Sequence, residues 1–344
     1  MTRWPRVFLL WVCGVLAGMQ FAKVSVAFQA LQALYSVTPT QIGLVLSTVG
    51  LVGLVLGVTM GLCAPTVGYR RLLLAGLGLG AVVSALQAML PPFPLLLASR
   101  MLEGASHLAV VVAAPTLIAA SCAPAHRSIV MGLWSTFVGV AFAITAAVGG
   151  PIMARLGVEG LLLAHAVGMA LLAVAAWLAL RHDRAIAPPG PLPGLRQLLY
   201  QHAEVYRVFD TALPGLCFLC YTATAVALLT YIPPWAGPDQ SWLAVVLPLM
   251  VIAGNFSAGW LVLSSGIATP RHSSAACRRT AVSRSRGPPV ASSASSCWRA
   301  TAHSGVFIRS GPPWACAAEQ TTKARVAARD NAGAKAARYM VNAS

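Results

Sequence analysis

Ionisable side chains stand out inside two long apolar stretches of the sequence. Lys23 lies in the first stretch, and Gln20 precedes it by three positions, which puts both on one face of a helix. In a later stretch Arg100, Glu103 and His107 follow at intervals of three and four, so they also share one helix face. Ionisable groups inside apolar helices are costly and are therefore candidates for substrate binding or ion coupling.

These five residues can carry two kinds of chemistry. A buried Lys23 ammonium can attract an anion or give up its proton, and His107 can exchange protons because an unperturbed imidazole titrates near neutrality. Arg100 and Glu103 can pair, which lowers the cost of burying both charges. The alternatives are that Lys23 extends to the membrane surface and that Arg100 and Glu103 form a structural ion pair. We predict that the five residues belong to a substrate or coupling pathway.

The sequence contains no arrangement typical of an enzyme or of an ATP-driven pump. No serine, histidine and carboxylate are ordered as a catalytic triad, and no Gly-Lys-Ser/Thr phosphate loop is found. The eight cysteines do not have metal-ligand spacing. We therefore expect no enzymatic activity, no cofactor and no metal. Transport driven by an ion gradient remains, with protons as one candidate for the coupling ion.

The composition requires a lipid environment for the elements that carry these residues. Of the 344 residues, 58% are hydrophobic and 9% are charged, and the mean hydropathy is +0.74. Soluble domains carry about 25% charged residues. In a bilayer only helices and closed barrels satisfy the backbone, and unbroken apolar runs of about twenty residues indicate helices. The predicted fold class is an all-α membrane protein.

Apolar length and breaker residues predict eight spans. The first six form an N-terminal bundle over 1–180, a proline-containing cytoplasmic linker covers 181–208, and two further helices occupy 209–264. The predicted spans are 7–33, 42–64, 72–90, 94–120, 129–149, 160–180, 209–232 and 242–264.

Basic residues predict the orientation of the spans, because Lys and Arg are retained on the cytoplasmic side. Every second connection is basic, and the exception among the other connections is Arg155. This pattern predicts a bacterial-type inner-membrane protein with a cytoplasmic N-terminus. The basic positions, with one histidine, are Arg3, Arg6, Arg70, Arg71, His126, Arg127, Arg181, Arg184, Arg196 and Arg207.

The composition changes near Gly266. Residues 1–266 contain 47 leucines and residues 267–344 contain none, while twelve Lys/Arg and two Asp/Glu give this last part a net charge of +10. We expect residues 265–344 to form a disordered basic tail. The abrupt loss of leucine suggests a frameshifted reading of a longer gene.

Three local motifs resemble those of major facilitator superfamily transporters. Between the second and third spans, the segment 61–71 resembles the family's gating loop in Gly61, Gly68, Arg70 and Arg71, although Pro65 replaces its aspartate. Arg100-Met101-Leu102-Glu103-Gly104 resembles the family's Arg-x-x-Gln/Glu-Gly motif. The third motif resembles a glycine-rich helix-packing motif and consists of Gly139, Gly149, Gly150 and Pro151.

The resemblance, which covers residues 1–264, implies a secondary transporter of a small molecule that works by alternating access. It also implies that Tyr221, in the seventh span, lines the pathway. Lys23 and Arg100 favour an anionic substrate. The family has twelve spans and eight are predicted here, so a truncated product that does not transport is the second hypothesis. The third is a membrane-anchored protein whose tail binds anionic lipid or nucleic acid, although no nucleic-acid partner is expected.

Overall fold

The computed structural model describes residues 1–181, 193–207, 209–240 and 242–264, and these residues belong to one compact unit. All regular structure in the described part is helical, which confirms the predicted fold class. The predicted tail, 265–344, and the prolines of the predicted linker lie outside the described residues, apart from Pro193. The helices are α1 (Trp4–Val26), α2 (Phe28–Tyr35), α3 (Pro39–Val67), α4 (Tyr69–Ala88), α5 (Phe93–Ala120), α6 (Arg127–Ser135), α7 (Phe137–Leu180), α8 (Leu195–Arg207), α9 (Phe209–Ala236) and α10 (Leu243–Ser264), with 3-10 turns at Pro124–His126 and Pro238–Gln240.

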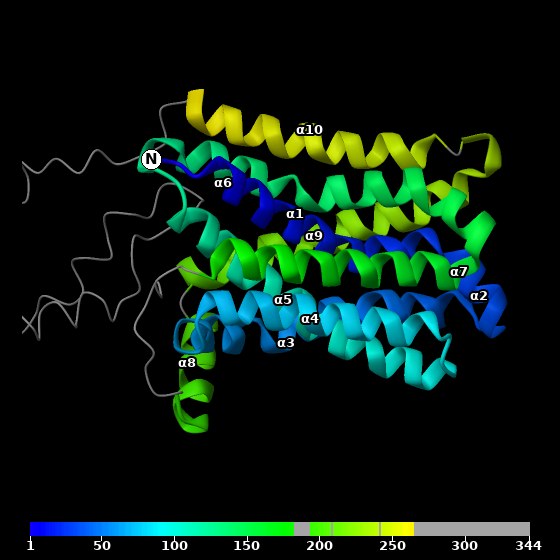
Figure 1. Ribbon diagram of the computed structural model, residues 1–344, viewed down its shortest axis with the longest axis horizontal. Helices are drawn as coiled ribbons and strands as arrows, with labels where there is room; N and C mark the ends of the chain where they lie inside the picture. The colour runs from blue at the N-terminus through cyan, green and yellow to red at the C-terminus, as the bar shows by residue number, and fades with distance from the viewer. Residues whose placement is uncertain (182–192, 208, 241, 265–344) are drawn as a thin grey trace, which may run out of the picture. The chain divides into compact units, whose positions relative to one another are not determined.

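Six helical stretches of the described residues are long and apolar enough to cross a membrane. One of them, Pro124–Leu180, holds two of the predicted spans. It has 57 residues, and a straight helix of this length would measure about 86 Å, whereas the bilayer core is about 30 Å thick. The chain turns back at Gly157 (φ 69°, ψ −175°), a backbone conformation that glycine adopts without strain. The two halves of α7 therefore lie side by side (Figure 1).

The ends of the first two predicted spans differ from the structure. The run predicted over 7–33 is divided at Ala27 into α1 and the short α2. The next helix begins where Thr38 accepts a hydrogen bond from the Gln41 backbone N–H, while the Gln41 side chain accepts one from the Thr38 N–H. Such reciprocal capping satisfies two N–H groups that the first turn leaves unpaired.

The segment 61–71, predicted as a gating loop, is helical in the structure except at one residue. Helix α3 continues through Gly61 and Pro65 to Val67, and α4 begins at Tyr69. The connection is the single residue Gly68, with φ 91°, so Arg70 and Arg71 belong to the first turn of α4. The two helices thus meet at a tight junction, and the gating role of Gly61, Gly68, Arg70 and Arg71 stays a prediction.

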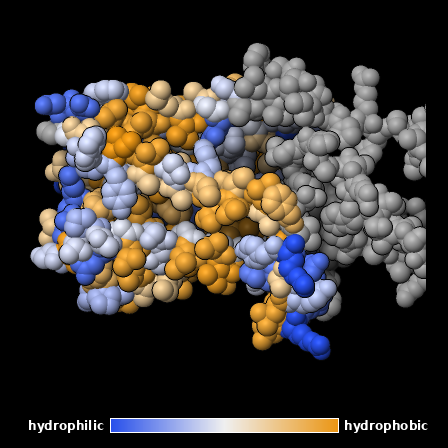
Figure 2. Space-filling view, turned by 180° about the vertical axis from the view of Figure 1, so that it is seen from behind, coloured by the Kyte–Doolittle hydropathy of each residue, from blue (hydrophilic) through white to orange (hydrophobic). Residues whose placement is uncertain are grey.

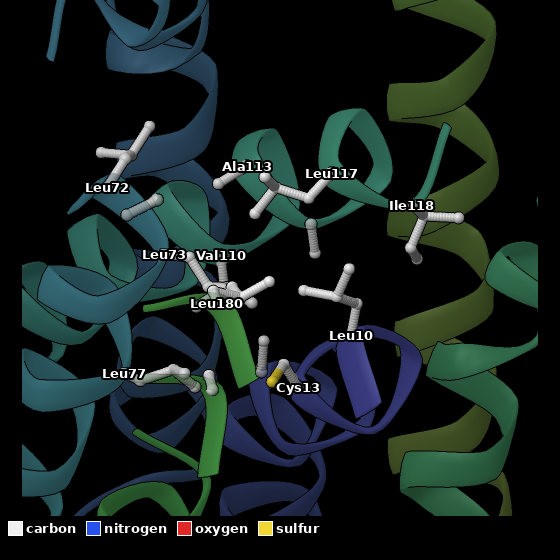
Figure 3. Close-up of a cluster of buried hydrophobic side chains, with 14 of the residues drawn as sticks. Leu10, Cys13, Leu72, Leu73, Leu77, Val110, Ala113, Leu117, Ile118 and Leu180 are labelled. Carbon is white, nitrogen blue, oxygen red and sulfur yellow. The ribbon is translucent and has the colours of Figure 1, made fainter. Parts of the chain in front are cut away.

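Four helices, α1, α4, α5 and α7, form the centre of the bundle. Their apolar side chains meet in a buried cluster that includes Leu10, Leu73, Leu77, Val110 and Leu180 (Figure 3). Outward-facing leucines, valines and aromatic residues cover much of the surface of the helices (Figure 2). Such a surface is satisfied by lipid rather than water.

Helix α10 packs onto this bundle through α6 and α7, and α9 contacts α1. A Cβ atom added to Gly139 on α7 would lie 2.6 Å from Ile252 Cγ1 and 3.1 Å from the Pro248 carbonyl oxygen, both on α10. The Asn255 side chain donates a hydrogen bond of 2.9 Å to the Ser135 carbonyl at the end of α6. Gly139 therefore lies at a close contact between α7 and α10, and Asn255 adds a hydrogen bond between helices.

The glycine motif is only partly a packing motif. A Cβ at Gly149 would lie 2.9 Å from Val26 Cγ1 on α1, so this glycine also marks a close helix contact. Gly150 has open space around its Cα, and the prediction of a packing role is wrong at this position. Pro151 lies inside the first half of α7.

Candidate functional site

The centre of the bundle holds an ion network that is removed from solvent. Lys23 Nζ on α1 lies 2.5 Å from Glu103 Oε1 on α5, and Arg100 Nη1 contacts the other carboxylate oxygen, Oε2. The exposed fractions are 1% for Lys23 and 0% for both Arg100 and Glu103. Lys23 therefore does not extend to the membrane surface, and the predicted pairing of Arg100 with Glu103 is confirmed.

Three further polar side chains surround the Lys23 ammonium. Lys23 Nζ donates to Ser84 Oγ (2.8 Å) and to Gln87 Oε1 (3.1 Å), both on α4, and lies 3.4 Å from His165 Nδ1 on α7. Glu103, Ser84 and Gln87 account for the three N–H donors of the ammonium group, and His165 is a fourth close neighbour. The Gln87 amide also donates to Glu103 Oε2 at 2.7 Å. The site thus joins α1, α4, α5 and α7.

The hydrogen-bond partners of His165 fix its tautomer. Its Nε2 lies 3.0 Å from the Leu16 carbonyl oxygen, which can only accept, so Nε2 carries the proton. In the neutral ring Nδ1 is then the acceptor, and it lies 2.9 Å from Ser84 Oγ. Ser84 therefore accepts from Lys23 and donates to His165, which makes a continuous chain of hydrogen bonds from Lys23 to His165.

Two glycines allow the helices to approach closely enough for these buried polar side chains to meet. A Cβ at Gly80 on α4 would lie 2.3 Å from Met169 Cε, 2.6 Å from Ser106 Oγ and 3.0 Å from Gln20 Nε2. At Gly104 a Cβ would lie 2.8 Å from Val52 Cβ on α3. The close approach of α5 to α3 lets Arg100 Nε donate to the Val45 carbonyl at 3.0 Å.

Gln20 lies beside the ion network and bonds to Ser106 rather than to one of the charged groups. Its amide nitrogen donates to Ser106 Oγ at 2.9 Å, and Ser106 in turn donates to the Gly76 carbonyl at 2.7 Å. Gln20 Oε1 and Arg100 Nη2 are buried without a hydrogen-bond partner among the described residues. The structure therefore brings Gln20, Lys23, Arg100 and Glu103 together, and their role in a substrate or coupling pathway stays a prediction.

The other two predicted pathway residues lie outside the network. His107 Nδ1 lies 2.9 Å from the Ala17 carbonyl oxygen, and its ring packs edge-on against Phe21 at 5.0 Å. Tyr221 on α9 is 44% exposed and donates a hydrogen bond of 3.0 Å to Asn255 Oδ1 on α10. The role of Tyr221 in a pathway therefore stays a prediction.

A cavity of about 260 Å³ lies between α1, α2, α7, α9 and α10. Its lining is uncharged and includes Phe28, Gln29 and Phe142. At its wall, Ser25 on α1 donates a hydrogen bond of 2.9 Å to Thr230 Oγ1 on α9, and both hydroxyls are buried. Helices α1, α2 and α7 therefore meet α9 and α10 at a small cavity, and the Ser25–Thr230 hydrogen bond lies at its wall.

The sequence analysis missed the residues that complete both sites. The predicted site residues do not include His165, Ser84, Gln87, Ser25 or Thr230. One signal was present, because Ser84 and Gln87 are three apart in an apolar run and share a helix face, like Gln20 and Lys23. No pattern along the chain indicates that this face meets Lys23.

The comparisons with known proteins agree with this architecture. The sequence of residues 10–308 matches the Major Facilitator Superfamily. The fold resembles the crystal structure of a bacterial homologue of the human lysosomal transporter Spinster, in an inward-facing and unoccupied conformation, with a TM-score of 0.53 and 18% identity over 78% of this chain. The chain spans 64% of the length of that protein. No curated protein sequence matches it.

The family match covers more than the helices that hold the ion network and the cavity, and it extends beyond residue 264, where the motif-based resemblance ends. The all-helical bundle with its membrane-crossing helices is the fold that this family has. The chain is a multi-pass membrane protein and belongs to the major facilitator superfamily.

Proposed function

We propose that the chain acts in secondary active transport of a small molecule, by alternating access and with protons as the coupling ion. The observation that carries this proposal is the contact of Lys23 with Glu103 and Arg100 in the centre of an apolar bundle. Buried ion pairs add little stability compared with apolar residues of similar volume. Retaining two cations and a carboxylate at 0–1% exposure therefore favours a role in ion coupling over a purely structural one.

The hydrogen-bond chain supports proton movement inside the bundle. A proton leaving Lys23 Nζ can pass to Ser84 Oγ while the Ser84 hydroxyl proton passes to His165 Nδ1. The products are a neutral Lys23 amine, an unchanged Ser84 hydroxyl and a His165 imidazolium. The positive charge thereby moves from α1 to α7, away from the direct contact with Glu103. Such a shift can bias helix positions during a transport cycle.

The contacts between the six-helix group and α9–α10 support alternating access. One contact is the hydrogen bond between Ser25 and Thr230, and another is the close approach of Gly139 to Ile252. Breaking the first would open the cavity at one end of α1. Because the lining is uncharged and Glu103 already engages Lys23 and Arg100, an anionic substrate stays a prediction that rests on the sequence.

The likeness to the Spinster homologue supports membrane transport. The alternation of basic and non-basic connections supports placement in a bacterial-type inner membrane with a cytoplasmic N-terminus. The beginning of α1 and the junction at Gly68 lie at the same end of the bundle (Figure 1). Arg3, Arg70 and Arg71 therefore gather on one side of the membrane.

Proton-coupled uptake in vesicles tests this proposal. The full chain is reconstituted in liposomes with an internal pH dye, and a panel of amino acids, sugars, organic acids and lipophilic cations is applied. We expect at least one solute to move protons, and Lys23→Met and Glu103→Gln to abolish that movement. Cys217→Ser, an exposed position on α9, is the matched control. If no solute moves protons or is itself transported, the non-transporting hypothesis is favoured instead.

A further inference from the structure

Helix α8 carries an apolar stripe that faces away from the bundle. Leu195, Leu199 and Tyr206 fall at intervals of four and seven, which places them on one helix face. Their exposed fractions are 73%, 63% and 51%. Leu198, His202 and Val205, on the neighbouring face, are half-buried, and the helix packs against α3 and α9. The exposed stripe is therefore a second apolar surface, beyond the one that attaches α8 to the bundle.

The direction of α8 differs from that of the spans. It lies across their axis, at the end of the bundle where α3 meets α4 (Figure 1). A helix that crosses the span axis at the ends of the spans lies parallel to the membrane surface. The apolar stripe is then at the level of the lipid headgroups, where amphipathic helices insert one face by about 5–10 Å.

Two arginines flank the stripe on the same side. Arg196 and Arg207 are eleven positions apart, so at about 100° per residue they point in nearly the same direction, and both are exposed. Glu204 lies on the far side of the helix. The space-filling view shows hydrophilic and apolar residues next to each other where α8 projects (Figure 2). Arg70 and Arg71 lie at the same end of the bundle.

We propose that α8 is an interfacial helix that binds the headgroups of anionic lipids. Leu195, Leu199 and Tyr206 enter the headgroup region, and Arg196 and Arg207 contact lipid phosphates. Charge complementarity favours an anionic lipid as the occupant, because an arginine near an anionic surface contributes about 1 kcal/mol. The bilayer that surrounds the spans passes beside α8, so this partner is always present. The proposal is independent of the transported solute.

Hydrogen–deuterium exchange of the full chain tests this inference. Nanodiscs that hold one chain each are made from phosphatidylcholine alone, or from phosphatidylcholine with phosphatidylglycerol. We expect exchange across 195–207 to be slower in the anionic discs, by about fivefold for each arginine. The difference should disappear in Arg196→Gln/Arg207→Gln and at high salt. Gln197→Ala, on the opposite face, is the matched control and should keep the difference.

Leu199→Ser separates the apolar contribution from the charge. It should speed exchange in both kinds of disc, because the stripe then inserts less deeply. Equal exchange of the unaltered chain in the two lipids would overturn the proposal. So would slow exchange that appears only with two chains in each disc, since a second copy would then be the occupant. None of these outcomes depends on transport, so the proposed function can fail while this inference holds, and the reverse.

Discussion

Lys23 Nζ lies 2.5 Å from Glu103 Oε1, and this contact joins α1 to α5 where neither side chain reaches solvent. Arg100 holds the other carboxylate oxygen. The Glu103 carboxylate is therefore the counter-ion of both Lys23 and Arg100 in an apolar surrounding. The arrangement makes Glu103 the central residue of the network, because its loss leaves two buried charges facing each other.

Replacing Glu103 should be more damaging than replacing Lys23. Glu103→Gln leaves Lys23 and Arg100 buried without a counter-ion and should cost about 3–5 kcal/mol. Lys23→Met leaves the Arg100–Glu103 pair intact and should cost less. Thermal unfolding in lipid nanodiscs measures both. The double variant should be more stable than Glu103→Gln alone, and a double variant that is less stable would contradict this account of the network.

Gly139 and Gly150 provide a matched pair for testing the packing of α7 on α10. Gly139→Ala places a Cβ 2.6 Å from Ile252 Cγ1 and 3.1 Å from a backbone oxygen, whereas Gly150→Ala meets nothing within 4 Å. The first should lower the melting temperature. The second should leave it unchanged or raise it, because alanine is favoured over glycine in helices by about 0.5–1 kcal/mol. Equal melting temperatures would show that this helix contact adds little.

The turn inside α7 should depend on Gly157. Its φ of 69° and ψ of −175° belong to a region that is essentially restricted to glycine, and forcing another residue into it costs about 1–3 kcal/mol. Gly157→Ala should therefore reduce the yield of folded chain and its melting temperature. Gly53→Ala, a helical position with open space, controls for the added methyl group. Equal effects of the two substitutions would show that the backbone conformation at position 157 does not require glycine.

The hydrogen bond between Ser25 and Thr230 should favour the closed arrangement of the cavity. Ser25→Ala removes a buried bond of 2.9 Å and should shift the equilibrium between closed and open forms by about 0.5–1.5 kcal/mol. Labelling of a cysteine introduced at Ala146, a half-buried residue of the cavity lining, should become faster. Thr222→Val serves as control, because the Thr222 hydroxyl bonds only within its own helix. Unchanged labelling would show that the Ser25–Thr230 hydrogen bond does not control access to the cavity.

Much of the fold could be predicted because a bilayer imposes simple rules. Apolar length identified the helices, and the predicted span 94–120 agrees closely with Phe93–Ala120. The exact ends depended on local chemistry instead. The break at Ala27 has no proline or glycine to mark it, and α3 continues through Pro65 because neighbouring helices support the backbone. Helix α8 was not predicted, because it is short and apolar residues cover only one side of it.

The candidate site could be predicted only in part. Charges inside apolar runs are conspicuous, so Lys23, Arg100 and Glu103 could be found. Ser84 and His165 are ordinary residues whose role arises from their contact with Lys23 across 61 and 142 positions. Hydropathy carries little information on which helix faces meet, because lipid satisfies any apolar face equally well. His107 and Tyr221 lie outside the ion network, and their place in a pathway stays a prediction from spacing and resemblance.

The separation of Lys23 from Glu103 along the chain has a consequence for biogenesis. Helix α1 is synthesised before α3 and α4, and α5, which supplies the carboxylate, follows these helices. Until then Lys23 is an unpaired cation inside a nascent span, at a cost of about 2.5–3.5 kcal/mol near the bilayer centre. We therefore expect α1 to remain beside the insertion machinery until α5 arrives, so that the charge pair sets the order in which the bundle assembles.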